Sequence, residues 1–287
     1  MVDLKEETRR ILAGYRPSDA GQVASSLETL WSQVPTTEAG AALVKAEIRD
    51  GYKALGVPVP ALTEIGKEVG KVARKRVDDF LPLARVLWER GGREGRLVAC
   101  TFLGDMELAA PERVLPTILE LAPTCLTWEE CDQLAMRALE PIVRKRPEEY
   151  LSRVEEWVRH ENKWVRRAGI TVIGRLPMKH PGYTETCLNM VEPALGDPDR
   201  NVQRAVSFAV RLAARGDPRA VHKFIERQSH RTDAASLWVL CDAMRSMTKK
   251  LLPEFKGLLP LYRNWQTRVD ARSQRSVAGA IRVLEGS

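Results

Sequence analysis

ENKWVRRAGITVIGRL, at residues 161–176, and DPDRNVQRAVSFAVRLA, at residues 197–213, repeat one pattern. The segment VRRA at 165–168 falls over VQRA at 202–205, so the two copies are 37 residues apart. Each copy opens with an acidic turn, and its apolar residues then recur with the period of an α-helix. The repeat is long enough for two helices, which predicts helix pairs that stack on one another.

Nearly every other segment also has helical periodicity, and the alternation typical of strands is absent from the sequence. The breaks carry Pro, Gly or Asp, as in GDPDR at 196–200 and RGDPR at 215–219. Two helices in 37 residues resemble a HEAT-like repeat, and a stack of such pairs forms an α-solenoid whose concave surface is a usual binding face. We therefore expect an all-α protein with one right-handed solenoid domain over residues 1–287 and a concave basic cleft.

The composition is that of a folded protein without disulfides, bound metal or a membrane anchor. Hydrophobic residues make up 44% of the chain and charged residues 29%, which excludes disorder as the default interpretation. The five cysteines are odd in number and contain no Cys-x-x-Cys pair, and the four histidines lack metal-ligand spacing. No Gly-rich phosphate loop, Ser-His-Asp signature, signal peptide or membrane span is visible in the sequence. We expect a cytoplasmic protein with reduced thiols and no metal or cofactor.

The net charge of +7 is unevenly distributed along the chain. From His160 onward there are 22 Lys and Arg against 12 Asp and Glu, a net charge of +10. Residues 1–159 carry a net charge of −3. A basic C-terminal half indicates a polyanionic partner, and nucleic acid is the first candidate.

The stretch LTWEECDQLA, at residues 126–135, places an acid where an apolar face is expected. Thr127 followed by Glu130 fits a capping box, which predicts a helix over residues 127–144. At about 100° per residue, Asp132 falls about 40° from Trp128, in the middle of the apolar arc. A buried acid needs a partner or a cavity, so Asp132 faces either a neighbouring arginine or a site. Periodicity alone does not decide between the two.

The helix predicted over residues 162–176 carries two adjacent arginines in different surroundings. On the helical wheel Arg166 points into the apolar arc, which is typical of a structural arginine with an acidic partner nearby. Arg167 lies outside that arc, beside Lys163 and Thr171. A solvated basic face would explain Arg167, but we predict that Arg167 and Lys163 face a ligand.

The helix predicted over residues 200–215 has the clearest surface pattern. Four arginines share one stripe with an aromatic residue at its edge, opposite a face of Val, Ala and Leu. The stripe consists of Arg200, Arg204, Phe208, Arg211 and Arg215. Arginines track phosphates, and an aromatic ring packs on a sugar or base. A row of arginines is also common on a solvated helix face, but the positive charge of this half of the chain favours DNA binding.

Five stretches together resemble the bacterial DNA-alkylation-repair glycosylases of the AlkD-like class, which are built from HEAT-like repeats. They follow the family's order and approximate spacing over about residues 45–215, while residues 1–40 match poorly. The stretches are YKALGVPVPALTEIGKE (52–68), LWERGGREGRLVA (87–99), TWEECD (127–132), NKWVRRAGI (162–170) and VQRAVSFAVR (202–211).

The resemblance implies which residues line a lesion-facing cleft. In the family these are a tryptophan, an aspartate four residues later and an arginine of the next W-x-x-R-A segment, which fall at Trp128, Asp132 and Arg167. An acid in an open cleft would also account for the position of Asp132 within an apolar arc. We therefore expect these three residues to be catalytic.

The sequence departs from the family pattern at three positions. Thr127 stands where the family often has a second tryptophan next to the first. Phe208 matches a second cleft tryptophan, and Glu47 falls where the family has a tyrosine near its N-terminal cleft. These departures concern the range of substrates more than the Trp-Asp-Arg set.

The resemblance also implies a reaction, the hydrolysis of the N-glycosidic bond of cationic alkylated purines such as N3-methyladenine and N7-methylguanine in duplex DNA. We expect a monomeric, monofunctional glycosylase of base-excision repair, in which Asp132 offsets positive charge that develops on the deoxyribose. Two alternatives stay open. A non-catalytic HEAT-like DNA-binding protein requires Asp132 to be salt-bridged away from the cleft. A protein-interaction scaffold leaves the basic C-terminal half unexplained.

Overall fold

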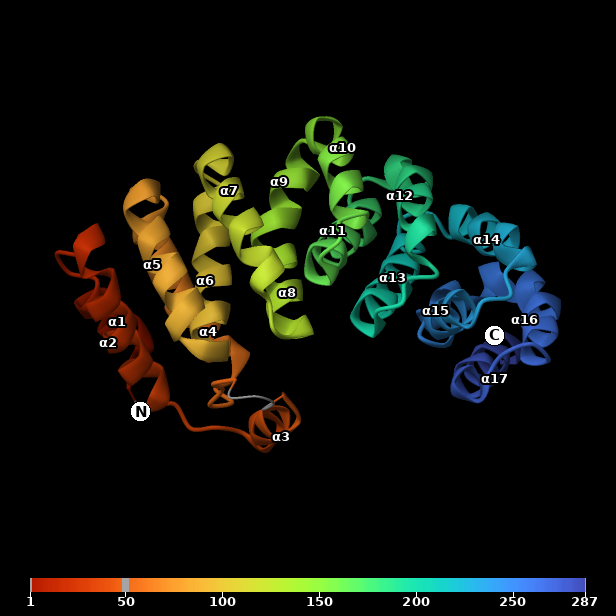
Figure 1. The fold of residues 1–287 in the computed structure, drawn as a ribbon, viewed down its shortest axis with the longest axis horizontal. Helices are drawn as coiled ribbons and strands as arrows, with labels where there is room; N and C mark the ends of the chain where they lie inside the picture. Colours follow the sequence, from red (N-terminus) through yellow and green to blue (C-terminus); the bar gives the residue numbers. More distant parts are fainter. Residues whose placement is uncertain (1, 48–51, 287) are drawn as a thin grey trace. The chain divides into compact units, whose positions relative to one another are not determined.

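The computed structural model describes residues 2–47 and 52–286. All regular secondary structure among these residues is helical, which confirms the all-α prediction. The chain divides into two compact units, Met1–Lys145 and Arg146–Ser287, and each is a stack of helix pairs (Figure 1). The organisation of both units as one solenoid domain with a concave cleft stays a prediction.

The first unit arranges its helices in two layers (Figure 1). Helices α1, α4, α6 and α8 follow one another in one layer, and α2, α5 and α7 follow one another in the second. The helices are α1 (Leu4–Ile11), α2 (Ala20–Ser32), α3 (Glu38–Glu47), α4 (Val59–Ala73), α5 (Val77–Arg90), α6 (Gly92–Glu107), α7 (Pro111–Leu121), α8 (Trp128–Leu134) and α9 (Glu140–Lys145). A π-helical segment, Ala135–Leu139, joins α8 to α9 without a break.

The second unit also has two layers of helices (Figure 1). Helices α11, α13, α15 and α17 form one layer, and α10, α12, α14 and a 3-10 segment, Lys249–Leu258, form the second. The helices are α10 (Pro147–Val158), α11 (Lys163–Arg175), α12 (Thr184–Val191), α13 (Arg200–Ala213), α14 (Pro218–Arg227), α15 (Ala234–Arg245), α16 (Leu259–Gln266) and α17 (Ala271–Glu285). The helices predicted over 162–176 and 200–215 correspond to α11 and α13.

Local sequence explains where the helices of the second unit's site-bearing layer begin. The oxygen of an Asn or Asp side chain accepts backbone N–H groups of the first turn, which have no partner within the helix. These caps are Asn162 for α11, Asp199 for α13, Asp233 for α15 and Asp270 for α17. Each cap follows a turn, so the polar residues between repeats fix the start of the next helix in this layer.

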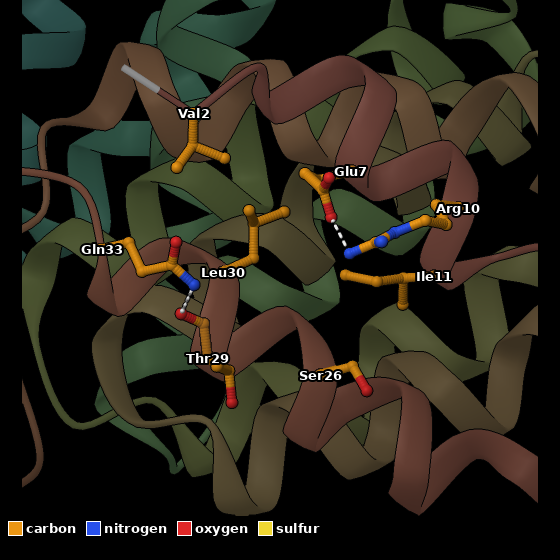
Figure 2. A pocket seen from close by; sticks show the side chains of 8 residues that line it. All are labelled: Val2, Glu7, Arg10, Ile11, Ser26, Thr29, Leu30 and Gln33. Atoms are coloured by element: carbon orange, nitrogen blue, oxygen red, sulfur yellow. Dashed lines mark hydrogen bonds and ion pairs between the residues drawn. The ribbon is translucent and has the colours of Figure 1, made fainter.

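A cavity of about 430 Å³ lies between α1 and α2, in the part of the chain with the poorest resemblance to the repair family (Figure 2). Its apolar lining comes from Val2, Ile11 and Leu30. At its rim the Arg10 guanidinium pairs with the Glu7 carboxylate. The two charged side chains that line the cavity are therefore paired with each other, and the cavity is a seam between two helices.

No helix within residues 2–47 and 52–286 is both long and apolar enough to cross a membrane.

Candidate nucleic-acid interface

The N-terminus of α8 is capped by the threonine that the sequence predicts. Thr127 Oγ1 accepts the backbone N–H of Glu130 at 3.4 Å. The reciprocal half of the capping box is different, since the Glu130 carboxylate accepts the N–H of Leu126 at 2.9 Å. Glu130 therefore fixes the turn before the helix, and α8 begins at Trp128.

Trp128 and Asp132 lie on the same side of α8, one turn apart. The indole of Trp128 is 40% exposed, although tryptophan is usually among the most buried residue types on average. Asp132 is half-buried. The helix therefore presents an aromatic ring and a carboxylate together at the surface of the first unit.

The π-helical segment corrects the predicted position of Asp132. A π turn holds one residue more than an α turn, which sets back the residues after it by about 100°. Leu139 and Val143 therefore rotate away from the arc of Asp132 and into the core with Cys131 and Leu134, where all four are buried. The prediction that Asp132 lies in the middle of the apolar face is wrong: it lies beside that face. π turns of this kind are frequent at functional sites.

A buried network of charges supports the start of α8. Arg93, on α6, holds both carboxylate oxygens of Glu129 at 2.7 and 3.0 Å. Arg96, one turn later, donates to the buried Glu130 at 2.8 Å and lies over the ring of Trp88. Buried ion pairs of this geometry fix one arrangement of the helices they join, because breaking one leaves a charge without compensation. The backbone of Trp128 is therefore held from α6.

This network was not predicted from the sequence, although a signal for it exists. The segment GREGR at residues 92–96 is followed by the apolar run LVAC, so charged residues stand at the start of a buried helix. The Glu94 carboxylate accepts the backbone N–H groups of Gly56 and Val57 at 3.0 and 3.2 Å. Charges that are internal to an apolar helix predict partners on a neighbouring segment, here the loop before α4 and the start of α8.

Arg166 has the structural role that the helical wheel predicts. Its Nε donates to the Asp197 carboxylate at 2.7 Å, and its Nη1 donates to the carbonyls of His160 and Glu161 at 2.8 and 2.7 Å. The side chain thus joins α11 to the turn before it and to the turn before α13.

Arg167 is placed differently from the prediction. Its side chain is 5% exposed, and its Nη1 donates to the carbonyl of Asn201 in the first turn of α13. The neighbouring Thr171 is 1% exposed. The expectation that Arg167 lies outside the buried face is wrong, because α13 packs on this side of α11. The catalytic role of Arg167 stays a prediction.

The arginine stripe of α13 is found where the wheel places it. Arg200, Arg204 and Arg215 are exposed, and Phe208 and Arg211 are half-buried. The opposite face is buried, as predicted, and consists of Val202, Ala205, Ala209, Leu212 and Ala213. Because α13 is a regular α-helix over its whole length, the 100° wheel describes it correctly.

Aromatic rings hold several cations of this surface in place. Arg200 lies over the ring of Trp238 on α15 at 5.1 Å, and Arg211 lies over the ring of Phe208 at 5.2 Å. Burial lowers the pKa of the Arg211 guanidinium, with Asp242 opposing this effect. Cation–π contacts of this kind orient a guanidinium without neutralising it. The aromatic residues therefore order the cationic surface of the second unit.

Lys163 lies at the N-terminus of α11 between a ring and an acid. Its Nζ is 5.0 Å from the centre of the Trp164 ring and 3.4 Å from the Asp199 carboxylate. Burial raises the pKa of Asp199, but the N–H of Asn201 and the Lys163 ammonium outweigh it and hold that pKa below its ordinary value. The acid that caps α13 is therefore stabilised in its charged form by the lysine of α11.

The described residues contain no group of three or more His, Cys, Asp or Glu that could hold a metal ion. All five cysteines are buried free thiols, and burial raises the pKa of Cys187 to about 12. A thiol with such a pKa is not a nucleophile at neutral pH.

A sequence profile of the family described as DNA alkylation repair enzyme matches residues 36–247, which is more than half of the chain. The chain belongs to this family. The matched segment contains α8, α11 and α13. Because the family repairs alkylated DNA, its members interact with DNA, and so does this chain. This confirms the family that the five stretches of sequence predict.

Other comparisons add little to the family match. One solved structure of an engineered protein is 11% identical to the chain and covers 100% of it and 98% of its own length, with a TM-score of 0.35. A second engineered protein is 10% identical and covers 100% of both chains, with a TM-score of 0.34. A designed armadillo repeat protein in complex with the peptide (KR)4 is 13% identical, covering 86% of this chain and 100% of its own, with a TM-score of 0.33. No curated protein matches the chain significantly.

The predicted site residues of this repair enzyme fall in both units. Trp128 and Asp132 belong to the first unit, and Arg167 and the stripe of α13 belong to the second. In the first unit the two residues lie on one helix, α8, and in the second unit the predicted residues lie on the neighbouring helices α11 and α13. That all of them line one cleft stays a prediction. The side chain of Glu47, at the position of the family's N-terminal tyrosine, lies outside the described side chains.

Proposed function

We propose that this DNA alkylation repair enzyme is a monofunctional glycosylase that hydrolyses the N-glycosidic bond of cationic alkylated purines, such as N3-methyladenine and N7-methylguanine, in duplex DNA. The observation that carries the proposal is the single turn of α8 on which Trp128 exposes its indole and Asp132 presents a carboxylate beside the apolar face. Family membership supplies the substrate, which is alkylated DNA.

The chemistry of a cationic lesion matches these two side chains. An alkylated purine that already carries a positive charge leaves as a neutral base, so the enzyme does not need to protonate it. As the bond from C1′ to the base nitrogen breaks, its electron pair departs with the base and positive charge develops on the deoxyribose. The Asp132 carboxylate stabilises this charge. The oxygen of a water molecule then bonds to C1′, and one proton of that water passes to Asp132.

Trp128 contributes binding rather than proton transfer. The π face of an indole attracts a cationic base or sugar by about 0.5 to 2 kcal/mol. This attraction favours the charged lesion over an unmodified, neutral purine. The buried pairs between α6 and the start of α8 hold the ring in place, which limits the entropy lost on binding.

In this proposal the second unit holds the duplex. Lys163 and the stripe of α13 bind backbone phosphates, and Phe208 packs on a sugar or base. Arg167 acts at the phosphate beside the lesion and, through its bond to the Asn201 carbonyl, positions the first turn of α13. Its low exposure makes this bond part of its role, because a buried guanidinium needs hydrogen-bond partners.

The test is release of purines from methylated duplex DNA under single-turnover conditions, with the wild type and with Asp132→Asn. Loss of an electrostatic group aimed at the developing charge lowers the rate by about 10² to 10³-fold. Asp105→Asn is the matched control, because Asp105 is a half-buried acid on the neighbouring helix α6. We expect the control to release purines at the wild-type rate and both variants to keep the affinity of the wild type for undamaged duplex.

Two outcomes would contradict the proposal. Wild type that binds duplex but releases no base from a panel of N3- and N7-alkyl lesions would favour the non-catalytic DNA-binding alternative. Equal rates for the wild type and for Asp132→Asn would remove the carboxylate from the mechanism.

A further inference from the structure

A groove runs between α15 and α17 at the end of the second unit. Gly279, on α17, lets the Arg245 side chain cross that helix, because a Cβ at Gly279 would lie 2.6 Å from the Cδ of Arg245. The groove has a volume of about 390 Å³. It is lined by Arg245, Arg275, Ala278, Gly279, Arg282 and Val283. A glycine at this crossing therefore brings arginines of two helices to the walls of one groove.

The groove is strongly cationic. None of the described residues that line it is acidic, and all three of its arginines are exposed. Arg245 pairs with Asp242 on its own helix. The side chains of Arg275 and Arg282 make no hydrogen bond or ion pair within residues 2–47 and 52–286. Two guanidinium groups are therefore held close to a third without internal neutralisation, and such a cluster attracts an anion.

The spacing of the two arginines on α17 fits a repeating anion. Arg275 and Arg282 are seven residues apart, which places them on one face of the helix and about 10.5 Å apart along its axis. The axial rise of one DNA strand is about 3.4 Å per phosphate, so about three steps along the strand cover the same distance. The flexible side chains absorb the remaining mismatch.

The groove continues the surface of α13. Ser207, on α13, donates to the Asp242 carboxylate on α15 at 2.7 Å, and the second oxygen of Asp242 accepts from Arg245. Arg211 and Arg215 of the stripe lie near enough that Asp242 and Arg215 both influence the pKa of Arg211. The helices α13, α15 and α17 are consecutive in one layer. The arginines of the three helices therefore follow one another across this layer.

We propose that the groove between α15 and α17 binds the phosphodiester backbone of duplex DNA and extends the contact surface of α13. Helix α17 lies beyond residue 247, where the family match ends, so this contact is a property of the present chain outside the matched segment. The proposal rests on the proposed function only in taking duplex DNA as the ligand.

The first test is the salt dependence of affinity for an undamaged 30-base-pair duplex, measured by fluorescence anisotropy. Each lost phosphate contact flattens the plot of log affinity against log salt by about one unit. Arg275→Ala with Arg282→Ala should flatten the slope by about two. Arg219→Ala with Arg268→Ala is the matched control, because it removes the same charge from exposed sites on α14 and after α16. The control should keep the wild-type slope, and an equal slope in both double variants would overturn the proposal.

A second measurement uses the unaltered protein and so does not depend on how the variants fold. Phenylglyoxal modifies accessible arginines, and mass spectrometry reads the extent at each position. We expect saturating duplex to protect Arg275 and Arg282 while Arg219 reacts at the same rate with and without DNA. Equal modification of Arg275 and Arg282 in the presence and absence of duplex would also overturn the proposal.

Base release separates this proposal from the proposed function. If the wild type releases no alkylpurine but Arg275→Ala with Arg282→Ala flattens the salt dependence of affinity, the glycosylase proposal is wrong and the proposal that the groove binds DNA is supported. If the wild type releases alkylpurines and this double variant keeps the slope of the control, the groove fails and the glycosylase stands. Replacing both arginines by lysine should restore most of the slope, since lysine keeps the charge.

Discussion

Glu107, at the end of α6, is a buried carboxylate without a hydrogen bond. It is 1% exposed, and neither of its carboxylate oxygens has a hydrogen-bond partner among the described residues. The Lys145 ammonium is 3.7 Å from Oε1, which is too far for a hydrogen bond. Burial raises the pKa of Glu107 above its ordinary value, against the opposing charges of Lys145 and Arg144. The folded protein thus holds this proton more tightly than the unfolded chain does.

A pKa that is raised in the folded state determines how the free energy of unfolding changes with pH. The contribution of Glu107 is fully present below the unfolded pKa, about 4.3, and is lost as the pH rises through the folded value. We therefore expect Glu107→Gln to have a higher melting temperature than the wild type at pH 7.5 and an equal one at pH 4. Glu156→Gln, at an exposed position of α10, should match the wild type at both. A lower melting temperature for Glu107→Gln at pH 7.5 would show that the Lys145 pair outweighs burial.

Among the elements, α6 and the π-helical segment pack with no room between their backbones. A Cβ at Gly104 would lie 2.3 Å from the carbonyl oxygen of Arg137. Gly104→Ala gains up to about 1 kcal/mol in helix propensity, but the overlap forces the segment to move at a cost of about 1 to 3 kcal/mol. We expect a lower melting temperature and slower base release, because Asp132 shifts with its helix.

The control for this substitution is Gly182→Ala. A Cβ at Gly182 meets nothing within 4 Å, so the melting temperature and the rate of base release should stay at the wild-type values. Gly104→Ala with an unchanged melting temperature would mean that the π-helical segment adapts freely and does not fix the position of α8.

Regular elements are predictable from the sequence, and the exceptions have physical causes. The wheel at 100° per residue gives the buried and exposed faces of α13 correctly because that helix has no irregularity. It misplaces Asp132 because one extra residue in the π turn rotates everything that follows. The sequence of Ala135–Leu139 has no local pattern that predicts a π turn. The resemblance to the family implies a role for Asp132 independently of the wheel, and that role stays a prediction.

Long-range packing accounts for the other differences. Arg167 lies in a charged stretch of α11, and only the approach of α13, over thirty residues later, buries it. Glu130 reads as the second half of a capping box, but Arg96 and Tyr52, far away in sequence, make it a buried acid. Periodicity reports which face of a helix is apolar. It does not report which charged residues the neighbouring repeat covers.

At the scale of the whole molecule, the charge is divided between the two units. Residues 146–287 carry 25 Lys and Arg against 16 Asp and Glu, while residues 1–145 carry 20 against 22. Many cations of the first unit are paired with acids, as Arg85 is with Glu120 and Arg113 with Asp78. The exposed arginines of α13 and α17 have fewer acids near them. The second unit is therefore expected to supply the phosphate contacts of the duplex.

This division predicts which substitutions change the salt dependence of DNA binding. Arg204→Ala with Arg215→Ala, both exposed on α13, should flatten the plot of log affinity against log salt by about two units. Arg74→Ala with Lys75→Ala removes the same charge from exposed positions of the first unit and should leave the slope unchanged. Fluorescence anisotropy with undamaged duplex measures both. Equal flattening by the two pairs would mean that the affinity for DNA depends on the total charge of the protein and that the stripe of α13 does not contact phosphates specifically.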